Sequence, residues 1–329
     1  LWQIIYLWQI LLRILVFVQK MTYIAGIELG GTTCVAAIST IKNPDIILEQ
    51  EEFITGNDPA SLLNTLVEFL QQILKKHVTE RFEAIAIASF GPIDLCKESA
   101  KYGYITSTPK PGWQNVNVVG VFSQAFPSIP VMFETDVNAP AIGEAMVSSL
   151  PETPNVVYIT VGTGVGVGVY INGSPVHGLL HPEAGHMIAG VMPGDTYSGG
   201  CPLHKNCIEG MVNSNALAAR AGIQPSQLKT LPDSHWVWET AGYYLGVLCV
   251  NLTYTLSPDF IILGGGVMQR KVLFDLCRKN FKQLNAGYVL VEKFQMDGGL
   301  NEYICRSKFS NNAGIIGALL LAKSAVNPA

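Results

Sequence analysis

Charge is the first thing that this sequence has little of. Asp, Glu, Lys and Arg make up 14% of the 329 residues, and the formal net charge is −4. Soluble domains usually carry roughly 25% charged residues, and proteins that bind nucleic acid need a basic surface to neutralise its phosphates. We therefore expect no nucleic-acid partner. The length exceeds the roughly 100 to 200 residues of one domain and favours two domains.

A disulfide framework is also missing. The chain has seven cysteines, an odd number, spread from position 34 to position 305. Disulfide-rich chains are typically small secreted domains, so this pattern favours a reducing, cytoplasmic location. The C-x-x-C motif of thioredoxin-like redox pairs is absent as well.

The common nucleotide-binding motifs are absent too. No segment matches the P-loop pattern G-x-x-x-x-G-K-[ST], and no strict G-x-G-x-x-G opens a helix. Three glycine turns follow apolar, strand-like runs instead, in "GIELGGT", "TVGTGVGVG" and "IILGGGVM". Each is either a tight turn next to a strand or a turn whose backbone N–H groups contact phosphate. The local sequence leaves both interpretations open.

Residues 1–20 form an apolar run, "LWQIIYLWQILLRILVFVQK", close to the length of a membrane span. Arg13 in its middle is costly at bilayer depth, and neither a basic start nor a small-residue cleavage site marks a signal peptide. Met21 directly precedes a strand that opens a well-formed domain. We expect residues 1–20 to lie outside the fold, as a product of upstream translation or a gene-model error. The alternative is a membrane anchor.

The remainder of the chain predicts alternating strands and helices. Residues 23–40 predict a β-hairpin around a glycine turn, 59–78 an amphipathic helix, and 84–91 a buried strand. Residues 156–173 repeat the hairpin in a second unit that begins near Thr135. The recurrence indicates two related α/β halves, whose two turns could hold a polyphosphate from both sides of a cleft.

Asp136 lies in "FETDVNAPAIGEAM", at the predicted junction of a strand and a helix. An aspartate at such a junction commonly caps the N-terminus of the helix. The functional interpretation is a general base, because phosphoryl transfer to an alcohol needs a carboxylate that takes the proton of the attacking hydroxyl.

The segment "CPLHKNC" places Cys201, His204 and Cys207 at even spacing in a glycine-rich region. A fourth ligand is available upstream in "HPEAGH", from His181 or His186. Four nitrogen and sulfur ligands with no open position are typical of structural zinc. We prefer His186, because it leads into the loop that ends at Cys201, and we expect His177 and His181 to face the cleft or solvent.

Several motifs together resemble the bacterial-type fructokinases of the ROK sugar-kinase family. They are, in order from Met21 to the end of the chain, "GIELGGT", "SFGPID", "TPKPGW", "TDVNAPAIGE", "TVGTGVGVG", "HPEAGH", "CPLHKNCIEG" and "IILGGGVM". The resemblance implies a two-domain α/β fold of the actin-like ATPase (ribonuclease H-like) type with a cleft between the domains. It assigns residues 21–134 and 311–329 to the N-terminal domain and 135–310 to the C-terminal domain, and it implies a homodimer.

The resemblance also implies roles for individual residues. Asp136 is similar to the catalytic base that acts on the sugar hydroxyl. The residues similar to the ATP-binding positions are Gly30, Gly31, Thr32, Gly162, Thr163, Gly164, Asn215, Gly264, Gly265, Gly266, Val267 and Met268. The residues similar to the sugar-side positions are Pro111, Gly112, Trp113, Glu183 and Glu209. The residues similar to the zinc ligands are His186, Cys201, His204 and Cys207.

Two details refine this expectation. Ser214-Asn215 stands at a nucleotide-contacting position where the family's fructokinases usually have Gly-Pro. Thr135 directly precedes Asp136, as in the fructokinase branch, whereas glucokinases usually have Asn at this position. The resemblance thus implies an ATP- and Mg²⁺-dependent fructokinase with structural Zn²⁺, acting on a small sugar. The alternatives are a broader mannose or glucose kinase, a non-catalytic sugar-sensing protein like the ROK repressors, and, if residues 1–20 are an anchor, an inactive membrane-tethered binder.

Overall fold

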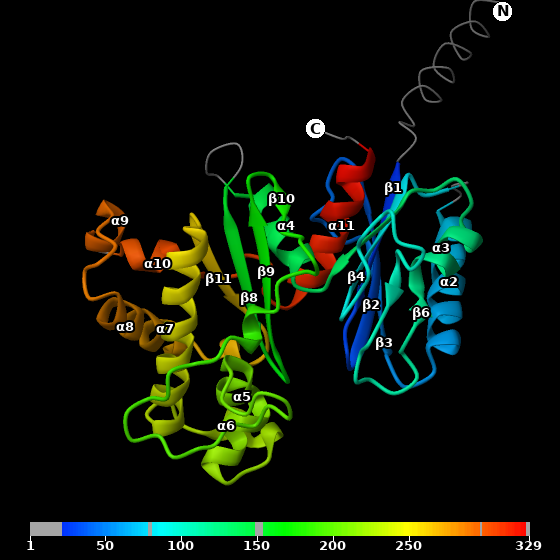
Figure 1. Cartoon of the computed structure of the whole chain (residues 1–329). Coiled ribbons are helices and arrows are strands. Elements are labelled where there is room, and N and C mark those ends of the chain that lie inside the picture. Colours follow the sequence, from blue (N-terminus) through cyan, green and yellow to red (C-terminus); the bar gives the residue numbers. More distant parts are fainter. Residues whose placement is uncertain (1–21, 78–80, 149–153, 297, 327–329) are drawn as a thin grey trace, which may run out of the picture.

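The computed structural model describes residues 22–77, 81–148, 154–296 and 298–326 (Figure 1). The extension predicted over residues 1–20 lies outside this part of the chain. Within the described residues, no helix combines the length and the apolar composition of a membrane span. Two five-stranded sheets form the framework, with helices between them and on their outer faces (Figure 1).

The first sheet has the strand order β3-β2-β1-β4-β7. Its strands are β1 (Tyr23–Leu29), β2 (Thr33–Thr40), β3 (Glu49–Ile54), β4 (Ala84–Ser89) and β7 (Val131–Thr135). β1 and β2 are antiparallel, whereas β1, β4 and β7 run parallel. The hairpin predicted over residues 23–40 and the buried strand predicted near residue 84 are therefore confirmed.

The second sheet repeats this topology with the order β10-β9-β8-β11-β12. Its strands are β8 (Val156–Val161), β9 (Val165–Ile171), β10 (Ser174–Pro175), β11 (Phe260–Gly264) and β12 (Ile304–Arg306). β8 and β9 form an antiparallel hairpin, and β8, β11 and β12 are parallel. Each sheet thus consists of a hairpin continued by two parallel strands, which confirms the prediction of two related α/β halves.

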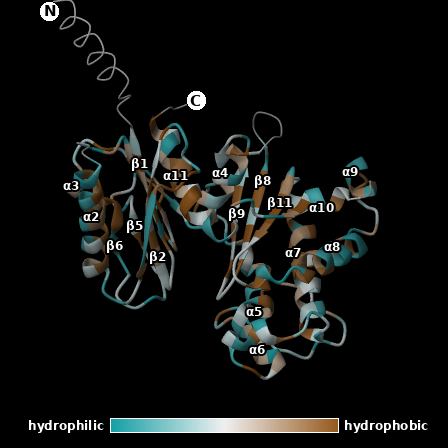
Figure 2. Ribbon diagram, turned by 180° about the vertical axis from the view of Figure 1, so that it is seen from behind, coloured by the Kyte–Doolittle hydropathy of each residue, from teal (hydrophilic) through white to brown (hydrophobic). Residues whose placement is uncertain are grey.

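Two helices lie between the sheets, α4 (Asn138–Met146) and α11 (Ala313–Val326) (Figure 1). α11 packs on β1 and β4, α4 packs on β8 and β9, and the two helices contact each other. A side chain at Gly317 would lie 2.3 Å from the Ala139 carbonyl, so glycine is required where the helices cross. Because α11 is enclosed, residues 313–322 are all buried and the helix is apolar on every side (Figure 2). We propose, from these contacts, that residues 311–329 belong to the first domain.

Further helices cover the outer faces of the two sheets. α2 (Pro59–Lys76) and α3 (Val118–Ala125) cover the first sheet, and Asp58 caps α2 by accepting the Ser61 N–H. α7 (Trp236–Leu256) and α8 (Val272–Asn285) cover the second sheet, and in Figure 2 the outward side of α8 is hydrophilic. The remaining short elements are β5 (Tyr104–Ile105), β6 (Val116–Asn117), α5 (Ile208–Val212), α6 (Ser214–Ala221), α9 (Glu292–Gln295), α10 (Gly299–Tyr303) and four 3₁₀ turns, η1 (Ala184–His186), η2 (Pro225–Thr230), η3 (Val267–Gln269) and η4 (Ser310–Asn312).

Candidate active site and metal site

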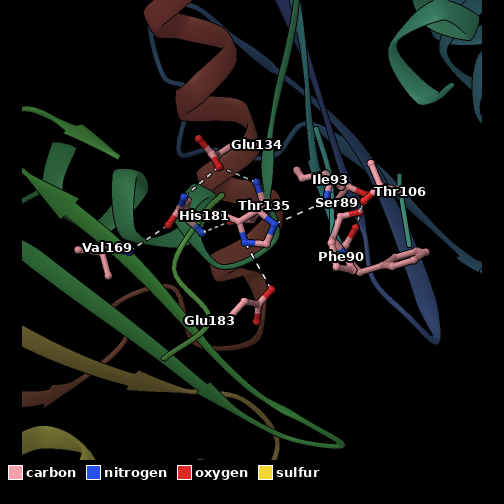
Figure 3. Close-up of polar contacts among 11 residues, drawn as sticks. Ser89, Phe90, Ile93, Thr106, Glu134, Thr135, Val169, His181 and Glu183 are labelled. Carbon is pink, nitrogen blue, oxygen red and sulfur yellow. Dashed lines mark hydrogen bonds and ion pairs between the residues drawn. The ribbon is translucent and has the colours of Figure 1, made fainter. Parts of the chain in front are cut away.

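Asp136 follows the last residue of β7, at the end of the sheet where the parallel strands β1, β4 and β7 all terminate. Its backbone N–H donates to the Ser89 carbonyl at the end of β4, at 2.9 Å. The Asn138 N–H at the start of α4 donates to the Thr135 hydroxyl at 3.0 Å (Figure 3), and the Asp136 carboxylate makes no capping bond. The capping interpretation of Asp136 is therefore wrong, because Thr135 performs that task and leaves the carboxylate available.

The Asp136 carboxylate borders a cavity of about 300 Å³ between the two halves. The lining residues are Glu28, Asp136, Pro140, Tyr158, Thr160, Gly265, Gly266, Ser310, Asn311, Ala313 and Gly314. Most come from the ends of strands in both sheets or from the turns that follow them, and the others come from α4, from η4 and from the start of α11. Ligands of α/β proteins commonly bind at such strand ends, and a helix N-terminus favours bound anions.

Two carboxyl groups in this cavity have strongly perturbed acidities. Burial and, to a smaller extent, the nearby charge of Glu183 raise the pKa of Asp136 to about 6. Burial and then the charge of Asp136 raise the pKa of Glu28 to about 7, while the Ile315 N–H in the first turn of α11 opposes this shift. Paired carboxyl groups with raised pKa values are typical of functional sites, and a cation between them would offset the repulsion.

Glu28 was not predicted as a site residue from the sequence. The available signal was a single acidic residue in the otherwise apolar strand "YIAGIEL", two positions before the glycine turn. A side chain at Gly314 would lie 2.2 Å from the Glu28 carboxylate, so α11 approaches this group closely. Carboxylate oxygens are the ligands that Mg²⁺ prefers, and Glu28 and Asp136 could hold that ion together with phosphate oxygens.

A second cavity, of about 710 Å³, lies in the second half. It is lined by the turn residues Gly162 and Thr163, by Ser214, and by Trp238 and Arg270 among others. Its volume is within the usual range for a small-molecule site. Trp238 and Arg270, whose guanidinium stacks on the indole at 4.4 Å, were not identified from the sequence.

The residues of the third glycine turn are divided between the two cavities. Gly266 lines both cavities, so the two adjoin there, and Val267 lines only the larger one. Met268 is buried in the core, and Gly264 is packed against the Tyr158 hydroxyl, so neither residue lines these two cavities. A residue with a side chain at Gly265 would be strained at its φ of +89° and would clash with Val161.

The other predicted nucleotide residues lie in turns or on the surface and line neither of these two cavities. Gly30, Gly31 and Thr32 form the turn between β1 and β2, closed by a bond from the Gly30 N–H to the Thr33 carbonyl at 3.1 Å. Gly164 closes the corresponding turn of the second half through a bond from the Gly162 N–H at 2.8 Å. Asn215 is exposed and does not line the larger cavity, which its neighbour Ser214 does.

The predicted sugar-side residues occupy different environments. The Glu183 side chain is 52% exposed and close enough to Asp136 to raise the pKa of that carboxyl. Glu209 is half-buried and accepts the Val165 N–H at 3.1 Å. This bond fixes the Glu209 carboxylate next to the β8–β9 turn. Pro111 and Gly112 are exposed.

Trp113 is fully buried, in contrast to its neighbours in the same loop. Its indole N–H donates to the Gly56 carbonyl at 3.1 Å, and its ring packs edge-on against Phe90. A side chain at Gly112 would clash with the Asn57 carbonyl. Trp113 therefore anchors the loop to the core of the first half. If the loop contacts a sugar, Trp113 acts by holding the loop in place.

His186, Cys201, His204 and Cys207 lie together, with one ligand atom of each within 4.8 Å of the others. The Cys201 Sγ atom is 4.0 Å from His186 Nδ1 and 3.8 Å from His204 Nδ1, and Cys207 Sγ is 3.7 Å from His186 Nδ1. Ligands about 2.1 to 2.3 Å from one tetrahedral zinc would be about 3.5 Å apart, so only a small contraction is needed. The donor set fits zinc, and His181 lies outside it.

The backbone around this cluster is shaped for it. The His204 and Gly210 N–H groups donate to the sulfurs of Cys201 and Cys207, at 3.5 and 3.4 Å. A side chain at Gly210 would lie 1.9 Å from the Lys205 carbonyl, so the loop can fold back only with glycine there. α5, which begins at Ile208, carries Glu209 away from the cluster toward the β8–β9 turn.

The comparison with known proteins agrees with these features. The family model described as "ROK family" matches residues 24–325. A protein named fructokinase from Pediococcus pentosaceus is 38% identical over 93% of this chain and 99% of its own length. A fructokinase from Lactococcus lactis subsp. cremoris is 38% identical over 81% of this chain and 87% of its own.

Among solved structures, a ROK hexokinase from Thermus thermophilus superposes with a TM-score of 0.73. It is 22% identical and covers 94% of this chain and all of its own. This similarity supports the two-domain α/β fold. With the family model matching almost the full length of the described chain, the protein belongs to the ROK family.

Proposed function

We propose that this protein phosphorylates fructose with ATP to give fructose 6-phosphate, with Asp136 as the general base. The observation that carries the proposal is the position of Asp136. Its carboxylate borders a cavity that both halves line, and this cavity adjoins, at Gly266, the larger cavity of the second half. A donor nucleotide in the larger cavity would direct its terminal phosphate toward Asp136.

The proposed step is an in-line transfer. The Asp136 carboxylate accepts the proton of the sugar hydroxyl while the hydroxyl oxygen attacks the γ-phosphorus and ADP leaves. When bound, Mg²⁺ would offset charge on the phosphates. Glu28, which shares the cavity with Asp136, supplies a second carboxylate to hold the cation, and the start of α11 favours the phosphoryl oxygens.

The sugar would lie on the other side of Asp136, against Glu183. Glu209, which accepts the Val165 N–H beside the β8–β9 turn, is the second proposed sugar contact. We propose that structural Zn²⁺ on His186, Cys201, His204 and Cys207 holds the segments that carry both glutamates. The ion would fix the segments in place without taking part in the chemistry.

The test of the function is a coupled assay of ADP release with ATP and fructose, mannose or glucose. We expect fructose to give the largest kcat/KM. A chain that releases no sugar-dependent ADP with any of the three sugars would be the non-catalytic sugar sensor instead. If mannose or glucose equals fructose, the broader hexose kinase is the correct description. The homodimer and the cytoplasmic location remain predictions, which sedimentation and cell fractionation would test.

The acidity of Asp136 predicts a pH dependence. A general base acts when it is ionised, so activity is present above the pKa of about 6 and is lost as the pH falls through it. We expect kcat/KM for the sugar to decrease about tenfold per pH unit below that value. The profile should be measured by initial rates, with samples held at low pH and returned to pH 7.5 as the control for inactivation. A flat profile down to pH 5 would contradict the assignment of the base.

A further inference from the structure

His181 lies in the segment between β10 and η1, yet its side chain is only 5% exposed. Both ring nitrogens have partners, and these belong to different halves of the molecule (Figure 3). Nε2 lies 3.5 Å from the backbone nitrogen of Ile93, in the loop after β4, and Nδ1 lies 3.4 Å from the Glu183 carboxylate. The imidazole therefore connects the proposed sugar carboxylate to the opposite half.

The two partners fix the proton on this ring. A backbone N–H can only donate, so Nε2 of His181 must accept the Ile93 N–H. A neutral imidazole that accepts at one nitrogen carries its proton on the other, so the N–H is at Nδ1, the nitrogen that lies 3.4 Å from the Glu183 carboxylate. The ring thus places one N–H beside a carboxylate whose side chain is half exposed.

The loop that receives His181 is itself well held. The Thr106 N–H and hydroxyl both donate to the Pro92 carbonyl, at 2.8 and 3.0 Å, and Ile93 pairs with Ile105. Gly91 leaves room for the ring, because a side chain there would lie 3.3 Å from its Cε1 and Nε2 atoms. The same loop begins directly after Ser89, which accepts the Asp136 N–H. Through His181, Glu183 is therefore connected to the loop that follows Ser89, the residue that accepts the N–H of the proposed base.

We propose that His181 is a positioning residue, which holds the Glu183 carboxylate toward the sugar by bridging it to the Ile93 N–H of the other half. The proposal rests on the proposed function, since it takes Glu183 as a sugar contact. It differs from a purely structural role in one respect: the effect of His181 on sugar binding must pass through Glu183.

The chain provides a matched control in His177. This residue lies in the same segment and also contacts the first half, where its Nε2 atom is 2.9 Å from the buried Glu134 carboxylate. The position of Glu134 is labelled in Figure 3. It has no contact with Glu183 among the interactions of the described residues. Substitution of His177 removes a cross-half contact of the same kind and leaves the His181 bridge intact.

The experiment is a double-mutant cycle on the KM for fructose. His181→Gln keeps an acceptor near the Ile93 N–H but loses the Nδ1–H beside Glu183, and the loss of one such polar contact to a carboxylate corresponds to about a tenfold rise in KM. We expect that rise with an unchanged KM for ATP, and partial recovery in His181→Asn, whose amide nitrogen takes the place of Nδ1. In the Glu183→Gln background, His181→Gln should have no further effect. For His177→Asn we expect independent effects instead, so that its fold-change in KM multiplies with the fold-change caused by Glu183→Gln.

The outcomes separate the two proposals. An active wild type in which His181→Gln keeps its KM, or in which the rise persists with Glu183→Gln, would overturn the role of His181 alone. A wild type inactive on fructose would overturn the proposed function first. If His181→Gln melts at a much lower temperature, Gly91→Ala takes its place, because it crowds the imidazole without removing it. That variant should raise the KM for fructose in the same Glu183-dependent way, and an unchanged KM would again refute the proposal.

Discussion

Asp136→Asn should lower kcat by a factor of about 10² to 10⁴, the range in which a positioned general base contributes, while fructose and ATP still bind with nearly normal affinity. The amide has the shape of the carboxylate but cannot accept the proton of the sugar hydroxyl. The backbone contact of this residue to Ser89 and the Thr135 cap of α4 do not involve the side chain, so both should survive the substitution.

The raised pKa of Asp136 also predicts how Asp136→Asn changes the stability of the fold. Folding raises the pKa of Asp136 from 3.8 to about 6, so the ionised carboxylate destabilises the fold at neutral pH. The neutral Asn should therefore melt at the same or a higher temperature. Asp275→Asn, on the exposed face of α8, makes the same chemical change away from the cavities and serves as the control. The base would have to be another group if kcat fell less than tenfold in a folded Asp136→Asn protein.

We expect Cys207→Ser to abolish binding of the proposed zinc ion and to lower both stability and sugar affinity. Cys207 is fully buried, and its sulfur accepts the Gly210 N–H at the start of α5. Structural zinc sites contribute several kcal/mol to folding, which for a chain of this size corresponds to a fall in Tm of about 10 °C or more. Sugar affinity should fall in parallel, because η1 ends at His186, three residues after Glu183, and α5 carries Glu209.

Three measurements test this prediction together: zinc content by elemental analysis, Tm by calorimetry, and fructose affinity by titration. Cys96→Ser is the matched control, since Cys96 is an exposed cysteine outside the cluster. Treatment of the wild type with a chelator should reproduce the Cys207→Ser result. The positioning role of the ion is refuted if the metal is lost while fructose affinity and Tm stay at wild-type values.

Much of the framework could be predicted because it is encoded locally. The helix over residues 59–78 shows its core-facing leucines at helical spacing, and the structure has α2 at Pro59–Lys76. The two hairpins show apolar runs around glycine turns, and both are present. The cysteine and histidine spacing suggested a metal site, and the four predicted ligands lie together.

The site was less predictable, because its members come from segments far apart in the chain. Glu28 and Asp136 are both strand-end carboxylates, but their sharing of one cavity depends on the parallel pairing of β1, β4 and β7. Val267 faces the larger cavity whereas Met268, the next residue, is buried in the core, a difference set by the 3₁₀ turn η3. Trp113, expected on the sugar side, is buried beneath its loop.

The sequence by itself determined the two α/β halves, the glycine turns and the metal-binding residue types, since periodicity, turn chemistry and ligand identity act over a few neighbouring residues. Only the tertiary structure decided which of two local roles a residue takes. Thr135 caps α4 and so leaves Asp136 for the cavity, and His181, which was expected to face the cleft or solvent, is buried between Ile93 and Glu183. Such choices depend on contacts between residues distant in the chain, and no local pattern carries that information.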